Sequence, residues 1–159
     1  MKNCLTVLLI AFTFLSCGTT KTIRNSKKVI KGAWELSEVS FSDYGSFRTT
    51  FFGDASKSCL EGSNWVFVPN NNTGTYLIEK GNCSPGLRNF IFTIQEVNPE
   101  TGLYDFLLKP TDEKKKSADN KGYRVNLSQL SDIDMQWVLK TSIDGKTITI
   151  NMNFTKLTE

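Results

Sequence analysis

Apolar and polar residues alternate along most of this chain with a period of two residues, which is the period of a β-strand. The clearest case is the stretch in which Ile148, Ile150, Met152 and Phe154 alternate with polar neighbours. Further short runs of alternation follow one another from Lys31 onward, with turn residues between them. About eight such runs predict an all-β fold, an antiparallel up-and-down barrel, because closure removes the two exposed edges of an open sheet.

Turn residues indicate where neighbouring strands join. The triplet Asn70-Asn71-Asn72, the stretch Asn98–Gly102 and the pair Asp144-Gly145 each separate two alternating runs, and the last is the strongest hairpin signal in the chain. A charged loop is predicted from Thr111 to Gly122. The predicted strands run over 34–41, 65–68, 75–78, 89–97, 103–108, 123–128, 133–140 and 147–154.

The first strand opens with Lys31–Leu36. Gly32 would let the chain bend closely under the barrel, and Trp34 would close that end and donate its indole N–H to a backbone carbonyl. The alternative is that Trp34 is a core aromatic residue with no special place. The apolar phase shifts by one residue in this strand, so a β-bulge is expected near Ser37-Glu38.

The segment Ser40–Gly62 has little strand pattern. Asp54 is predicted to cap a short helix over Ala55–Glu61, which Gly62 would end. Two positions remain open for its phenylalanines: they cover the mouth of the barrel, or they form a small separate core under the short helix, and the second is favoured. These residues are Phe47, Phe51 and Phe52.

The first residues of the chain are typical of an export signal. Lys2 precedes the apolar run Leu5–Leu15, which is too short for a lasting transmembrane helix. Leu15-Ser16-Cys17-Gly18 resembles the bacterial lipobox, in which the cysteine is acylated and becomes the first residue of the mature protein. The alternative is an ordinary secretory signal with a chance cysteine. The resemblance implies an anchor of several acyl chains.

Three segments follow from this interpretation: a lipoprotein signal peptide over 1–16, a lipidated flexible tether over 17–30 and a barrel domain over 31–159. The polar tail Gly18–Lys28 is expected to be disordered. Its basic residues would lie against anionic headgroups or simply be solvated. An acidic run directly after the lipidated cysteine resembles the surface-export signal of Bacteroidetes lipoproteins. No such run follows Cys17, so this resemblance implies an outer-membrane lipoprotein that faces the periplasm.

Charge and residue type exclude several function classes. The net charge of +3 comes from the tail and Lys2, so it does not indicate nucleic acid, and no nucleic-acid partner is expected. The chain has no histidine, so neither a metal site nor a histidine base is expected, and no cofactor is predicted. After Cys4 leaves and Cys17 is acylated, Cys59 and Cys83 remain in an oxidising compartment, where we expect them to pair.

The chain resembles the lipocalin-like lipoproteins of the Bacteroidetes over nearly the whole mature domain. The Gly-x-Trp element alone is weakly specific, whereas the Cys59–Tyr76 block with Cys83 is specific. One residue departs from the lipocalin pattern, because Lys156 stands where an arginine commonly covers the tryptophan. The residues that carry the resemblance are Gly32–Leu36, Cys59–Phe67, Asn70–Asn72, Gly74–Tyr76, Cys83, Gly122–Leu127 and Met152–Leu157.

The resemblance implies a barrel floor built from Gly32, Trp34 and Lys156, and a monomer that binds a small hydrophobic or amphipathic molecule. The alternative is an interaction or inhibitor protein of the cell envelope that acts through its loops, with a barrel filled by its own side chains. An enzyme is not expected. From the inward phases of the strands, the candidate ligand pocket is lined by Tyr76, Phe90, Phe92, Tyr123, Met135, Trp137, Met152 and Phe154.

Overall fold

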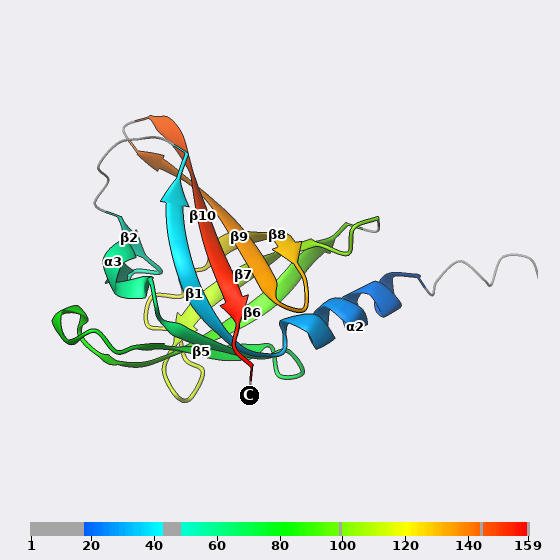
Figure 1. Cartoon of the computed structure of the whole chain (residues 1–159), viewed down its shortest axis with the longest axis horizontal. Coiled ribbons are helices and arrows are strands. Elements are labelled where there is room, and N and C mark those ends of the chain that lie inside the picture. The colour runs from blue at the N-terminus through cyan, green and yellow to red at the C-terminus, as the bar shows by residue number, and fades with distance from the viewer. Residues whose placement is uncertain (1–17, 43–48, 99, 144, 159) are drawn as a thin grey trace, which may run out of the picture.

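Eight antiparallel strands form the body of the protein in a computed structural model that describes residues 18–42, 49–98, 100–143 and 145–158 (Figure 1). Three short helical segments and a small hairpin accompany them. The helical segments are α2 Gly18–Ile30, α3 Lys57–Leu60 and the 3-10 turn η2 Gly81–Cys83, and the hairpin is β2 Thr50–Phe51 with β3 Ala55–Ser56. The barrel strands are β1 Gly32–Phe41, β4 Asn64–Val68, β5 Thr73–Ile78, β6 Gly86–Val97, β7 Tyr104–Thr111, β8 Tyr123–Leu130, β9 Asp134–Ile143 and β10 Lys146–Lys156.

Each strand from β4 to β10 pairs with the next along the chain, and β1 closes the barrel by pairing with both β10 and β4. Trp34 is the residue of β1 that lies opposite Lys156 on one side and Trp65 on the other. The predicted up-and-down barrel is therefore confirmed. The predicted bulge is confirmed as well, since the β1–β10 register shifts between Leu36 and Glu38. Asp144, part of the predicted hairpin signal, lies outside the described residues.

Burial follows the predicted alternation in most strands. Along β10 the side chains of Ile148, Ile150, Met152 and Phe154 are buried, while their neighbours are partly or fully exposed. Ile133 is an exception: we expected it on the apolar face of its strand, but it is 66% exposed. The reason is that β9 begins one residue later, after the 131–133 turn.

The floor of the barrel consists of Gly32, Trp34 and Lys156, with the last turn of α2 below it. The Trp34 indole N–H donates to the Ile30 carbonyl at 2.9 Å, and Lys156 Nζ lies 4.9 Å from the center of the Trp34 ring. Lys156 Nζ also donates to the Val29 carbonyl at 2.6 Å. A cation over an indole face is stabilising. Lys156 therefore joins β10, the tryptophan and the helix.

The prediction of a disordered tether is wrong for the described part of that segment, because Gly18–Ile30 is an α-helix. Its C-terminal half is held against the barrel: Ile30 is fully buried, and Ser26 Oγ donates to the Gly102 carbonyl at 2.9 Å. A prediction from composition alone underestimates the stability of such a helix, because tertiary contacts supply most of the stability of short helices. Of the described helices, none is both long and apolar enough to cross a membrane.

The short helix α3 is shorter than predicted, and Asp54 does not cap it. Ser56 occupies the cap position, and Ala55–Ser56 forms a strand instead of the first helical turn. The disulfide between Cys59 in α3 and Cys83 in η2 is present, which confirms the predicted pairing.

Candidate functional site

Most of the residues predicted to line a pocket lie in the packed interior of the barrel. Their side chains are at most 2% exposed; this group contains Phe90, Phe92, Met135, Trp137, Met152 and Phe154. The other two, Tyr76 and Tyr123, border an open cleft at one end of the barrel, and Phe90 also borders a smaller surface pocket. The structure thus divides the predicted pocket between the interior and one end of the barrel.

Aromatic rings from different walls of the barrel contact one another across the interior. Trp137 of β9 lies 5.7 Å from Phe67 of β4, 5.1 Å from Phe106 of β7 and 5.3 Å from Trp65, measured between ring centers. Phe67 and Phe106 are joined on the other side through Phe92, at 6.1 Å from each. These distances are those of rings in direct contact. At the level of Trp137 the interior is therefore occupied by the protein's own side chains.

The β2–β3 hairpin covers the end of the barrel opposite α2 (Figure 1), and we call this end the mouth. Phe52, at the tip of the hairpin, is only 4% exposed and points into the barrel. Its ring meets those of Trp65 and Tyr123 at 5.9 Å and 5.4 Å, in both cases edge to face. Of the two positions left open by the sequence, Phe52 takes the one at the mouth rather than the favoured separate core. Phe47 lies outside the described residues.

An unusual backbone conformation turns Phe52 inward. Phe52 has φ +55° and Gly53 has φ +73°, and the Asp54 amide donates to the Phe51 carbonyl at 2.9 Å. A positive φ costs a bulky L-residue on the order of 1 kcal/mol, so it persists only where surrounding contacts impose it. Here the contacts of the ring with Trp65 and Tyr123 supply that constraint.

Asp54, the residue after the tip, holds the hairpin to the barrel wall. Its Oδ2 accepts hydrogen bonds from the Tyr76 hydroxyl at 2.8 Å and from Arg88 Nε at 3.1 Å. Burial, together with the hydrogen bond to Asp54, raises the pKa of Tyr76 above its ordinary value. Tyr76 is therefore a neutral hydrogen-bond donor at physiological pH, and the carboxylate is held by one neutral and one cationic donor.

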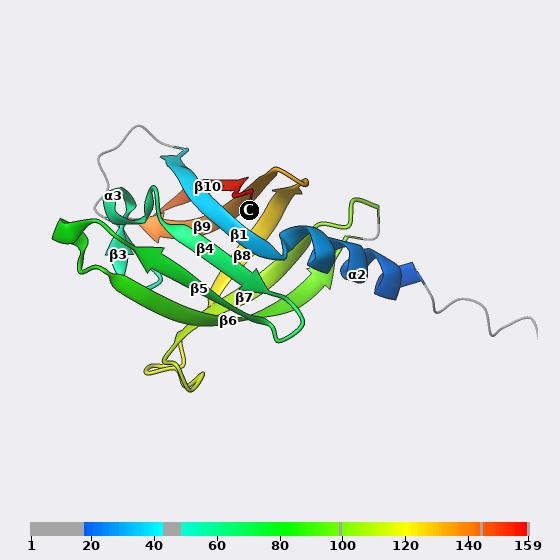
Figure 2. The ribbon, with the colours of Figure 1, turned by 60° about the horizontal axis from the view of Figure 1, so that its bottom comes forward.

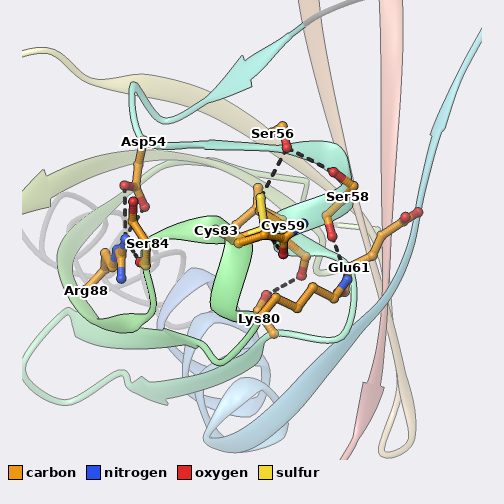
Figure 3. Close-up of a disulfide and its surroundings, with 12 residues drawn as sticks. Asp54, Ser56, Ser58, Cys59, Glu61, Lys80, Cys83, Ser84 and Arg88 are labelled. Atoms are coloured by element: carbon orange, nitrogen blue, oxygen red, sulfur yellow. Dashed lines mark hydrogen bonds and ion pairs between the residues drawn. A yellow bond between two sulfur atoms is a disulfide. The ribbon is translucent and has the colours of Figure 1, made fainter.

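A second set of contacts anchors the base of the hairpin (Figure 3). Arg88 donates to the carbonyls of Ser84 at 2.6 Å and Gly86 at 2.8 Å, in addition to its bond with Asp54. Beside it, the Cys59–Cys83 disulfide links α3 to η2. Lys80 Nζ donates to the carbonyls of Ser58 and Glu61 at the two ends of the α3 turn. The segment that carries Phe52 is thus tied covalently and by charged donors to the β5–β6 connection.

An open cleft of about 510 Å³ lies beside the hairpin tip. Its walls combine aromatic rings with charged groups from three regions, namely the hairpin, the β5–β6 wall and the loop before β8. Its aromatic residues are Phe52, Tyr76 and Tyr123, and its charged residues are Asp54, Arg88, Asp112, Lys116 and Asp119. Thr111 also lines the cleft, but its hydroxyl is buried away from solvent and has no hydrogen-bond partner among the described residues. The cleft therefore offers flat apolar walls together with donors and acceptors.

Sequence reasoning identified Tyr76 and Tyr123 but missed Asp54 and Arg88. Asp54 was interpreted as a helix cap because it precedes a short polar-apolar run, and Arg88 lies just before the predicted strand. One signal was available: the pair Phe52-Gly53 followed by an aspartate is typical of a tight turn. Within the described ranges, no group of three or more His, Cys, Asp or Glu side chains is placed to hold a metal ion.

Comparison with known proteins gives similarities of fold only. No family model matches the chain, and no curated protein matches it. Among solved structures, the chain is similar to a lipocalin-like protein from Bacteroides uniformis, with 9% identity, a TM-score of 0.49 and coverage of 81% of this chain and 99% of that one. It is also similar to bovine odorant binding protein, solved with its natural ligand, with 14% identity, a TM-score of 0.45 and coverage of 82% and 73%.

Proposed function

We propose that this protein is a lipocalin-like binding protein of the cell envelope that holds a small hydrophobic or amphipathic molecule at the mouth of its barrel, as a monomer and without catalysis. The observation that carries the proposal is the cleft of about 510 Å³ beside Phe52. Its volume falls in the range of small-molecule sites, roughly 300 to 1,000 Å³. The aromatic contacts in the interior support the mouth, rather than the center of the barrel, as the place of binding.

The walls of the cleft favour a flat ligand with one polar end. Tyr123 and Phe52 offer ring faces and edges for apolar contact, and such contacts favour aromatic or ring-shaped molecules. Arg88 and Lys116 lie on the same cleft as the carboxylates of Asp54, Asp112 and Asp119, so the cleft would serve both donor and acceptor atoms of a polar group on the ligand. This combination fits an amphipathic ring compound better than a long alkyl chain.

A fluorescent ring compound tests the proposal. N-phenyl-1-naphthylamine is apolar, and its emission increases when it leaves water, so a saturable, one-to-one increase is expected with this protein. Ala118 is an exposed residue that lines the cleft. Ala118→Trp should fill the cleft and weaken binding at least about tenfold, the equivalent of roughly 1.4 kcal/mol of lost contact.

Ile133→Trp is the matched control, because it adds the same side chain at an exposed position far from the cleft. It should leave the affinity for the probe unchanged. Unaltered binding by the Ala118→Trp variant, or equal loss in both variants, would exclude the mouth cleft as the site.

A specific observation also favours the second function, an interaction or inhibitor protein that acts through its loops. The interior is filled by aromatic rings, and the loop between β7 and β8 places exposed charged residues next to the mouth. Absence of any saturable binding of the probe by the wild-type protein would favour this alternative over ligand binding.

The proposal includes a lipid anchor on Cys17, outer-membrane localisation and a periplasm-facing position, as in the Bacteroidetes lipoproteins that the sequence resembles. Support comes from Leu15-Ser16-Cys17-Gly18 and the preceding apolar run. Several acyl chains are needed for stable anchoring, since each buried methylene contributes about 0.8 kcal/mol.

Mass spectrometry of the membrane fraction tests the anchor. The mature protein is expected to begin at an acylated Cys17, and the Cys17→Ser variant should lose both the acyl mass and the stable membrane association. If the Cys17→Ser protein keeps the same amino-terminal mass and remains in the membrane fraction, acylation at this residue is wrong.

A further inference from the structure

A basic face runs along the outer side of α2 and continues into the residue that follows it. It consists of Lys21, Arg24, Lys28 and Lys31, whose side chains are all exposed. Spacings of three and four residues place side chains on one side of an α-helix. The segment 18–31 contains no aspartate or glutamate. Among the described residues, none of the ion pairs involves these four cations.

The opposite side of α2 is fixed to the barrel, which determines where the basic face points. Ile30 is buried, Ser26 donates to the Gly102 carbonyl, and Lys27 Nζ donates to Asn72 Oδ1 at 3.5 Å. The Val29 carbonyl accepts from Lys156. These contacts prevent the helix from rotating about its axis, so the basic face points away from the barrel. The helix extends outward from the end of the barrel opposite the mouth hairpin (Figure 2).

We infer that the basic face of α2 binds an anionic membrane surface directly and thereby orients the barrel with its mouth away from the bilayer. Four fixed cations without neighbouring acids are complementary to a layer of negatively charged headgroups. Each cation near such a surface increases the binding constant by roughly fivefold. A flat array of this kind suits a surface better than a single bound ion. The inference deepens the proposed function by placing the helix at the membrane, but its test does not depend on the acyl anchor.

Sedimentation with vesicles tests the inference on the unacylated chain 18–159, which contains every strand of the closed barrel and both disulfide cysteines. The protein should bind vesicles made of equal parts phosphatidylglycerol and phosphatidylcholine, and should not bind vesicles of phosphatidylcholine alone. Added salt should weaken binding because it screens the charges. The Lys21→Gln/Arg24→Gln/Lys28→Gln variant should bind at least about tenfold more weakly.

The matched control, Lys114→Gln/Lys115→Gln/Lys140→Gln, removes the same charge from exposed positions outside α2. It should bind the anionic vesicles as the wild type does. Equal loss in both variants, or no binding of the wild type, would overturn the inference, as would tighter binding to duplex DNA than to vesicles. Circular dichroism establishes that each variant is folded. If mass spectrometry of the full-length protein finds no acyl group on Cys17 while the chain 18–159 still binds the anionic vesicles, the anchor is wrong and this inference stands.

Discussion

Replacing Trp137 with alanine is expected to lower the free energy of unfolding by about 3 to 5 kcal/mol, the range for a large aromatic residue removed from a packed core. The Trp137 side chain is fully buried and contacts Trp65, Phe67, Phe106 and Phe154. The cavity left behind would separate rings that now touch across the barrel. Urea denaturation of the variant and the wild type measures the difference.

Phenylalanine variants separate the packing of the indole from its hydrogen bonding. The Trp137 indole N–H has no hydrogen-bond partner among the described residues, whereas that of Trp65 donates to Ser63 Oγ at 2.8 Å. Trp137→Phe should therefore cost less stability than Trp65→Phe by about 1 kcal/mol, the net worth of one buried hydrogen bond. If Trp137→Phe proves as costly as Trp137→Ala, the indole N–H has a partner in the barrel, such as a bound molecule, and the packed interior must be reconsidered.

Removing the disulfide with Cys59→Ser/Cys83→Ser is expected to lower the free energy of unfolding by about 2 to 4 kcal/mol. The two cysteines are 24 residues apart, so the bond restricts a loop of that length in the unfolded chain. Denaturation under non-reducing conditions measures the loss.

Wild-type protein unfolded with a reductant present is the control, and it should match the double variant. Peptide mapping without reductant should recover Cys59 and Cys83 in one linked pair. Recovery of both as free thiols from correctly exported protein would contradict the expected bond.

The strands and the core could be predicted because one side of each strand faces the interior. Alternation of apolar and polar residues identifies that side, and turn residues such as Asn70–Asn72 limit each run. Even the bulge in β1 was visible, as a shift in the apolar phase before Val39. The disulfide followed from the number of cysteines and the expected compartment. These features depend on the local pattern of residues or on the number of cysteines, and both can be read from the sequence directly.

The mouth could not be predicted in the same way, because its geometry depends on partners far apart in the sequence. Aspartate is a common helix-capping residue, and Asp54 precedes a short helix. Its carboxylate instead accepts hydrogen bonds from Tyr76 and Arg88, which hold it at the barrel wall. The sequence around Phe52 does not alternate between apolar and polar residues, so no pattern predicts the direction of its side chain. Its inward position requires a positive φ angle, which the contacts with Trp65 and Tyr123 impose. The helical state of Gly18–Ile30 likewise depends on contacts with residues beyond 100 in the sequence.

Barrel closure by β1 has a consequence for the folding rate. The contact between Val29 and Lys156 joins residues 127 positions apart, and all of the β1–β10 ladder joins segments of similar separation. Folding slows as the mean sequence separation of contacts increases, because the entropy of a long loop is lost before its contacts form. The hairpins from β4 to β10 and the pairing of β1 with β4 join segments that lie nearer in the sequence and can form early, whereas the β1–β10 ladder must wait for the last strand. Until that ladder forms, the barrel is open and β1 has one unpaired edge, and this period is when the chain is most exposed to aggregation.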